Sequence, residues 1–166
     1  MDTSLFAGMG WTGCTHARRV GRWVLVLCIG ALLGACAGKI SDADIEDDLA
    51  TLKDVQRAVD EPSRGILLVD TRSRAEWEAD RIPGSTNLTL TQITGREGER
   101  DPRLARFSGM IVYGQDPSSS TARAMTKKLI TTGYSDVQFF PGGMFEWTNA
   151  KLPTRSGAPG EGMRER

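Results

Sequence analysis

Short apolar runs alternate along this chain with longer segments in which apolar residues recur every three or four positions. The apolar runs at 66–69, 110–113 and 137–140 are typical of buried strands, and 86–88 has the length of a short strand. Helical segments are predicted at 41–60, at 73–80, from the end of the 114–120 loop to about 132, and from 142 onward. Strands that alternate with helices predict an α/β sandwich around a mainly parallel sheet.

The segment 41–60 has helical spacing throughout, so it predicts one continuous first helix. Its apolar positions are Ile45, Leu49, Leu52, Val55 and Ala58. Several aspartates stand at its start, where the helix dipole favours negative charge: Asp42, Asp44, Asp47 and Asp48. We interpret them as a solvated acidic face.

The N-terminal segment has the pattern of a secretory signal. An arginine cluster at 18–22 precedes thirteen uncharged, mostly apolar residues, 23–35. A membrane-spanning helix needs about 20 apolar residues, whereas the apolar region of a signal peptide has roughly 7–15. The run ends Leu33-Gly34-Ala35-Cys36, which looks like a bacterial lipobox. An ordinary signal peptide and an uncleaved anchor are the alternatives.

The lipobox pattern predicts a lipoprotein signal peptide at 1–35 and a lipid-anchored tether at 36–41. The predicted strands and helices place a domain at 42–153, and the content of Gly, Pro and charged residues predicts a disordered tail at 154–166. Lipid on Cys36 would hold the protein to a membrane on the periplasmic side of the cell envelope. By resemblance to Gram-negative lipoproteins, Ala37 after the cysteine slightly favours the outer membrane.

The composition of the remaining chain excludes several kinds of chemistry. Removing residues 1–35 leaves 131 residues with 18 basic and 20 acidic side chains, which gives no support for nucleic-acid binding. The three cysteines all lie within the first 36 residues, and the single histidine is His16. Cys–His and Ser–His–Asp catalysis and the usual zinc ligand sets are therefore not expected. We predict no metal and no cofactor.

Four motifs in order resemble the rhodanese-like domain family. Leu68 to Arg72, then Glu76-Trp77, then Ile82 to Asn87, resemble the first signature of that family, and 111–147 resembles its second half. The resemblance covers roughly 40–153. It implies a three-layer sandwich with helices on both faces of a central sheet. Asp70 and Arg72 follow a buried strand, where open α/β sheets place their sites, and we interpret them mainly as an ion pair that holds neighbouring loops.

The resemblance breaks at the residue that carries the family's chemistry. In active members a cysteine directly follows the strand that matches 111–113, and loop amides at the next helix stabilise its thiolate and persulfide. Gly114 stands there in this chain, and no cysteine follows Cys36. This departure predicts a domain without sulfurtransferase activity, which acts by binding an unknown envelope protein or a small anion.

The loop after that strand offers the candidate anion-binding residues, which are Gly114, Gln115, Asp116, Ser118, Ser119 and Ser120. We expect one of the serines to cap the following helix. Two other functions stay open. Asp116 or a serine could perform phosphate or ester chemistry, although a serine without an adjacent base is a poor nucleophile. Alternatively, the domain is a structural element of an envelope complex and uses its acidic first helix as a contact surface.

Overall fold

The computed structural model describes residues 40–46 and 48–157 of the chain. The predicted signal peptide, Cys36 and most of the tether lie outside the described residues, as do residues 158–166 of the predicted tail. Within the described part, no helix has the length and apolar character needed to cross a membrane.

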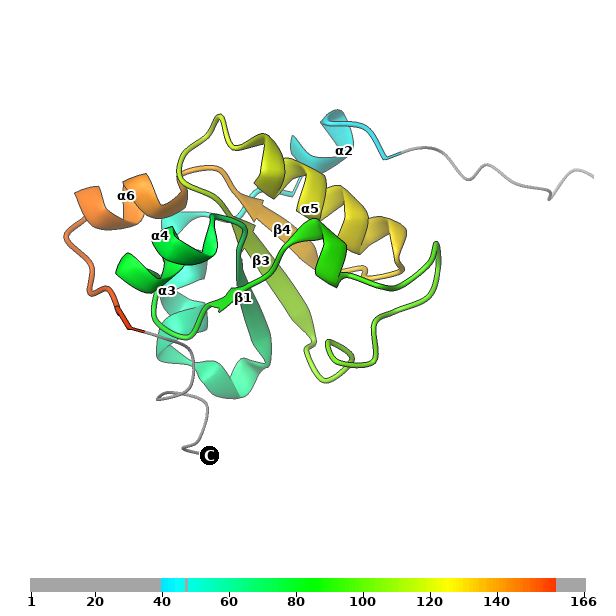
Figure 1. Ribbon diagram of the computed structural model, residues 1–166, viewed down its shortest axis with the longest axis horizontal. Coiled ribbons are helices and arrows are strands. Elements are labelled where there is room, and N and C mark those ends of the chain that lie inside the picture. The colour runs from blue at the N-terminus through cyan, green and yellow to red at the C-terminus, as the bar shows by residue number, and fades with distance from the viewer. Residues whose placement is uncertain (1–39, 47, 158–166) are drawn as a thin grey trace, which may run out of the picture. The chain divides into compact units, whose positions relative to one another are not determined.

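A four-stranded parallel sheet forms the centre of the domain (Figure 1). Its strands are β1 (Ile66–Asp70), β2 (Thr86–Asn87), β3 (Gly109–Tyr113) and β4 (Val137–Phe140). They lie in the order β2-β1-β3-β4, and every neighbouring pair is parallel. The prediction of an α/β fold with a mainly parallel sheet is confirmed.

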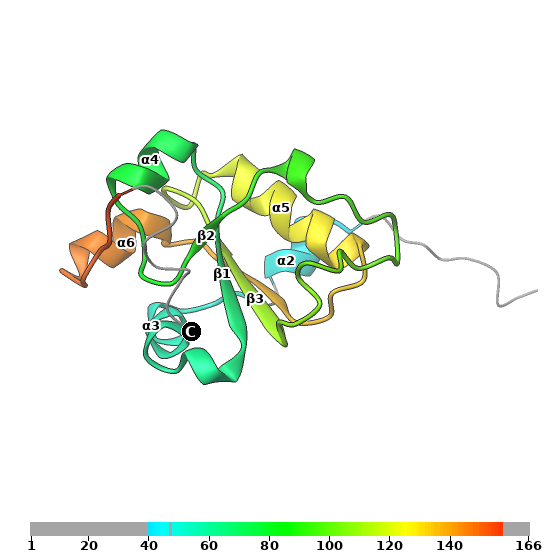
Figure 2. The same ribbon diagram turned by 60° about the horizontal axis from the view of Figure 1, so that its bottom comes forward.

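Helices cover both faces of this sheet, as Figures 1 and 2 show. The helices are α2 (Ala43–Glu46), α3 (Leu52–Asp60), α4 (Arg74–Ala79), α5 (Ser120–Thr131) and α6 (Gly143–Asn149), with short 3-10 turns η1 (Pro62–Arg64) and η2 (Leu90–Gln92). Successive strand residues alternate between two cores because side chains alternate across a strand. Residues of α2 and α5 pack in one core, and residues of α3 and α6 in the other.

The single helix expected at 41–60 is two helices that serve opposite faces of the sheet. Ile45 of α2 packs in the core with α5, whereas Val55 of α3 packs in the core with α6. Between them the chain crosses the edge of β4, where the Ala50 amide donates to the Phe139 carbonyl at 2.9 Å. Thr51 then starts α3 through a capping box with Asp54. The sequence predicted a single helix because the helical spacing of its apolar residues continues through this crossing without a break.

The chain remains hydrogen-bonded beyond Pro153, where the sequence predicted that the domain ends. Arg81 and Arg155 exchange two backbone hydrogen bonds of 2.9 Å, and the Gly157 amide donates to the Glu78 carbonyl at 2.9 Å. The Trp147 indole donates to the Pro153 carbonyl at 2.9 Å. Arg155 and Gly157 are therefore bonded to α4 and the residues after it, in contrast to the disordered tail that we expected from 154.

A buried carboxylate organises the irregular segment between η2 and β3. The Asp101 side chain, 1% exposed, accepts two hydrogen bonds of 3.0 Å from Arg103, from its amide and its Nε. A third, from Arg103 Nη2, measures 2.6 Å, and the Asp101 carbonyl accepts from the Tyr134 hydroxyl at 3.0 Å. The hydrogen bonds from Arg103 lower the pKa of Asp101 against the opposing effect of burial.

This pKa shift predicts how stability changes with pH. Because the folded pKa is below the unfolded value of about 3.9, the contribution of Asp101 is present above pH 4 and is lost as the pH falls further. We expect Asp101→Asn to lower the free energy of unfolding by about 1–3 kcal/mol at pH 7 in urea titrations. The difference in the free energy of unfolding between this variant and the wild type should be smaller at pH 2.5. An equal difference at both pH values would contradict this role of Asp101. An equally large loss of stability in Asp60→Asn, the control at an exposed carboxylate, would contradict it too.

Candidate functional site

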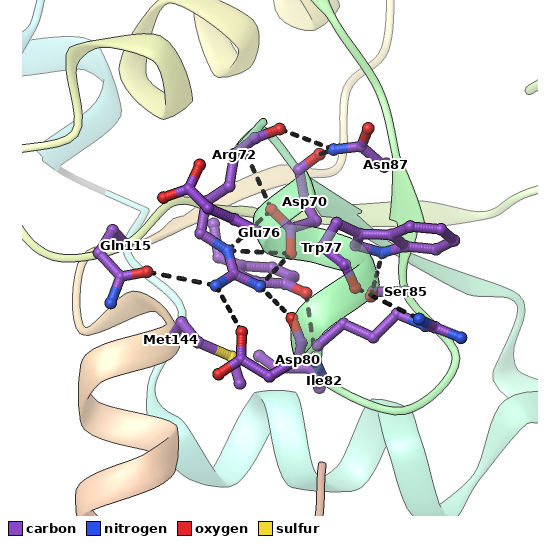
Figure 3. A network of polar contacts seen from close by, with 12 residues as sticks. Asp70, Arg72, Glu76, Trp77, Asp80, Ile82, Ser85, Asn87, Gln115 and Met144 are labelled. Carbon is purple, nitrogen blue, oxygen red and sulfur yellow. Dashed lines mark hydrogen bonds and ion pairs between the residues drawn. The ribbon is translucent and has the colours of Figure 1, made fainter. Parts of the chain in front are cut away.

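The predicted pair Asp70 and Arg72 lies at the carboxyl end of β1, beside the end of β3 (Figure 3). The Asp70 side chain is fully buried and that of Arg72 is 4% exposed. Arg72 Nη2 lies 2.9 Å from Asp70 Oδ2, and its Nε donates to both carboxylate oxygens at 3.2 Å. The backbone amide of Arg72 adds a bond of 2.9 Å to Asp70 Oδ1. The ion pair expected from the sequence is present and buried.

The Arg72 guanidinium also joins two segments that the sequence did not connect with it. Its Nη1 donates to Asp80 Oδ1 at 3.0 Å and to Gln115 Oε1 at 3.2 Å, and its Nη2 donates to the Asp80 carbonyl at 2.6 Å. Burial lowers the pKa of Arg72, but its hydrogen bonds with Asp70 and Asp80 and the charge of Asp70 outweigh burial and raise that pKa. Arg72 therefore stays charged and holds together the end of β1, the end of α4 and the loop after β3.

The polar groups beneath this ion pair are also hydrogen-bonded. Asn87 Nδ2 donates to the carbonyls of Asp70 and Arg72 at 3.1 and 2.8 Å, which fixes β2 against β1. The buried Tyr113 hydroxyl accepts from the Ile82 amide at 3.4 Å. Burial, with the charge of Asp70, raises the pKa of Tyr113 well above its ordinary value, so the phenol stays neutral. No buried side-chain nitrogen or oxygen in the described part of the chain lacks a hydrogen-bond partner.

The candidate loop at 114–120 is bonded to α6 through its carbonyls. Gly114 accepts from the Met144 amide at 3.0 Å, and Gln115 accepts from the Phe145 amide at 2.9 Å. The side chain of Ser119 packs over Gly114. A β-carbon placed on Gly114 would lie 2.5 Å from Ser119 Cβ and 3.3 Å from Ala122 Cβ, and closer still to the Ser119 hydroxyl. Position 114 accordingly has no room for a side chain unless Ser119 moves.

A carboxylate of the loop uses some of the donors that an anion would need. Asp116 Oδ1 accepts from the Ser118 amide at 2.8 Å and from the Ser118 hydroxyl at 2.6 Å. These two hydrogen bonds lower the pKa of Asp116. The Ser119 amide donates to the Asp116 carbonyl at 3.1 Å. The loop thus places its own negative charge next to the start of α5, where Ser120 is the first helical residue.

We expected a serine side chain to cap α5 by a hydrogen bond, and the structure shows no such bond. Ser119 occupies the N-cap position, but its side chain makes no capping hydrogen bond. The Ser118 hydroxyl is engaged by Asp116 instead. The residues of the predicted loop do lie together, and Gln115 brings the loop into contact with Arg72.

Other parts of the described chain offer less to a chemical site. No group of three or more His, Cys, Asp or Glu side chains in this part is placed to hold a metal ion. A cavity of about 130 Å³ lies where α3 and η1 meet the amino ends of β1, β3 and β4, at the opposite end of the strands from Arg72. Asp54, Arg57, Arg64 and Asp136 are its charged lining residues.

Comparison with known proteins identifies the domain. Residues 51–150 match the family model described as a rhodanese-like domain. The HTH-type transcriptional regulator Rv0324 of Mycobacterium tuberculosis is 29% identical over 94 residues, which cover 57% of this chain and 39% of the regulator. The chain therefore spans well under half the length of this curated relative.

Several solved structures share the fold. A thiosulfate sulfurtransferase from Pseudomonas aeruginosa is 20% identical with a TM-score of 0.54 and covers 70% of this chain and 22% of its own. A Rhodopseudomonas palustris protein of unknown function, described as a possible tyrosine phosphatase, is 20% identical with a TM-score of 0.55. The match covers 70% of this chain and 95% of that protein. The BH2092 protein of Bacillus halodurans is 19% identical with a TM-score of 0.55, and the match covers 67% of this chain and 79% of that protein. At such identities the likeness shows the fold alone.

Proposed function

Because residues 51–150 match its family model, the chain belongs to the rhodanese-like domain family, and we propose that it is a binding domain of the cell envelope that transfers no sulfur. The observation that carries this proposal is the combination of Gly114 with the Ser119 side chain packed over it. Gly114 stands where the resemblance places the catalytic cysteine, and the sequence has no cysteine after Cys36.

Sulfur transfer through a persulfide needs a thiolate at the start of the helix after β3. The side chains near that place are hydroxyls and the Asp116 carboxylate, and none of them forms a persulfide. Asp116 is hydrogen-bonded to Ser118, which lowers its pKa and makes it a weak base for activating a serine. This geometry supports binding over phosphate or ester chemistry, our alternative function.

Between an anion and a protein partner, the loop geometry favours a protein. An anion at the start of α5 would approach the Asp116 carboxylate, which already accepts a hydrogen bond from the Ser118 amide. Arg72, which donates to the Gln115 side chain of the loop, is buried and paired with Asp70 and Asp80. A small anion would therefore meet the negative charge of Asp116, whereas the positive charge of Arg72 is already paired.

We further propose that lipid on Cys36 anchors the domain on the periplasmic side of the envelope. The support is the apolar run at 23–35 and the lipobox-like Leu33 to Cys36. Mass spectrometry of the intact protein from membranes should show a chain that begins at Cys36 with added acyl mass. A chain that retains Met1, or an unmodified N-terminus beyond Cys36, would contradict the anchor.

The central test of the proposed function is enzymatic. We expect the purified chain to show no thiosulfate:cyanide sulfurtransferase turnover above a no-enzyme blank, since it has no thiol at the site. Gly114→Cys alone should also be inactive, because the new side chain collides with Ser119. A Cys36→Ser variant controls for the thiol near the N-terminus, and an active rhodanese run in parallel validates the assay. Turnover by the wild type that persists in Cys36→Ser would disprove the proposal.

A further inference from the structure

The cavity of about 130 Å³ at the amino ends of the strands combines apolar and charged lining residues. Its volume is roughly ten times what is needed to hold one water molecule, so it has room for a small molecule. Its apolar wall consists of buried and half-buried side chains, which are Ala58, Ile66, Met110 and Ile111. Its polar lining residues are Asp54, Arg57, Arg64, Asp136 and Gln138. An apolar wall with a few polar groups is typical of a small-molecule site.

Two arginines line this cavity with most of their hydrogen-bond donors unused. Arg57 Nη1 donates to Asp54 Oδ1 at 3.3 Å, and Arg64 Nη1 donates to Glu61 Oε2 at 3.4 Å. Neither guanidinium makes another hydrogen bond among the described residues. The two side chains are 51% and 52% exposed, so a ligand can reach them. Because a guanidinium presents a planar fork of donors that matches a carboxylate, both arginines are suited to bind one.

The same cavity contains a carboxylate that is available to a cation. Asp136 precedes β4, and its side chain lies over Gly109, where a β-carbon would be 2.9 Å from Asp136 Cγ and closer still to the carboxylate oxygen. Within the part of the chain that the structure describes, the exposed Asp136 side chain makes no hydrogen bond and no ion pair. The Asp54 carboxylate, in contrast, already accepts hydrogen bonds from Thr51 and Arg57. Asp136 is therefore the lining carboxylate that a ligand cation would meet.

We infer that this cavity binds a free α-amino acid with an aliphatic side chain. The ligand carboxylate accepts hydrogen bonds from Arg57 and Arg64, its ammonium group pairs with Asp136, and its side chain contacts the apolar wall. A simple anion would leave Asp136 unpaired beside it, and a simple cation would leave both arginines unused. The two arginines and two aspartates of the lining have a formal charge that sums to zero, which matches a zwitterion.

This site is separate from the loop after β3. The cavity lies at the opposite end of the strands from Arg72, and Gly114 and its loop are not among the lining residues. The inference therefore goes beyond the proposed function and does not depend on it. Binding is reversible and forms no covalent bond.

The test measures the binding of leucine to the purified full chain by isothermal titration calorimetry at two temperatures. Three analogues each lack one feature of leucine: isocaproate has no ammonium group, isoamylamine has no carboxylate, and glycine has no aliphatic side chain. We expect leucine to bind, and each analogue to bind about tenfold more weakly or less, because each one loses a charged or an apolar contact.

Variants of the lining residues locate the site. Asp136→Asn should weaken leucine binding about tenfold, and Arg64→Gln severalfold, because each removes one charged partner of the ligand. Asp60→Asn and Arg96→Gln are the matched controls, an exposed carboxylate and an exposed arginine outside the cavity lining, and should leave binding unchanged. Circular dichroism checks that each variant is folded, and Arg57→Gln provides a second reading if Arg64→Gln is unstable.

Several results would overturn this inference. One is the absence of any heat of binding with millimolar leucine at both temperatures. Another is an analogue that binds as tightly as leucine, because the cavity would then not recognise an aliphatic zwitterion. Unchanged leucine affinity in Asp136→Asn, or equal weakening by the two control variants, would show that leucine binds somewhere other than this cavity.

Discussion

The buried guanidinium of Arg72 is the constraint on which the carboxyl end of the sheet depends. Removing a charge from water costs several kcal/mol unless nearby groups compensate it. Asp70 supplies the opposite charge, and Asp80 and Gln115 accept the remaining hydrogen bonds. Because these acceptors come from β1, α4 and the loop after β3, satisfying one side chain fixes the relative positions of all three segments.

That arrangement has consequences for function. With Gln115 held by Arg72 and the Gly114 carbonyl held by α6, the loop lies close to the sheet, and Ser119 packs where a side chain at 114 would be. Asp116 places a carboxylate beside the amides at the start of α5. These contacts support a domain in which the family's reaction site is filled by the chain itself.

The sequence predicted most of the fold because its strands are continuous apolar runs. Residues 66–69, 110–113 and 137–140 all became strands, and the resemblance gave the correct family. The prediction of one continuous first helix was wrong, because Thr51 and Asp54 start a new helix while the apolar spacing continues. The Asp70–Arg72 pair was predictable because both residues stand at the end of a buried apolar run. Its contacts with Asp80 and Gln115 were not, because they depend on how distant segments fold together. Cys36 lies outside the described residues, so its lipidation stays a prediction.

The most direct test of this account is a double-mutant cycle at Asp70 and Arg72, read as the free energy of unfolding. Arg72→Met leaves a buried carboxylate without its cation, so we expect a loss of about 3–5 kcal/mol. The double variant Asp70→Asn/Arg72→Met should lose clearly less than the sum of its two single variants, because the pair acts as a unit. A loss below about 1 kcal/mol for Arg72→Met, additive with Asp70→Asn, would contradict the claim that this ion pair holds the carboxyl end of the sheet together.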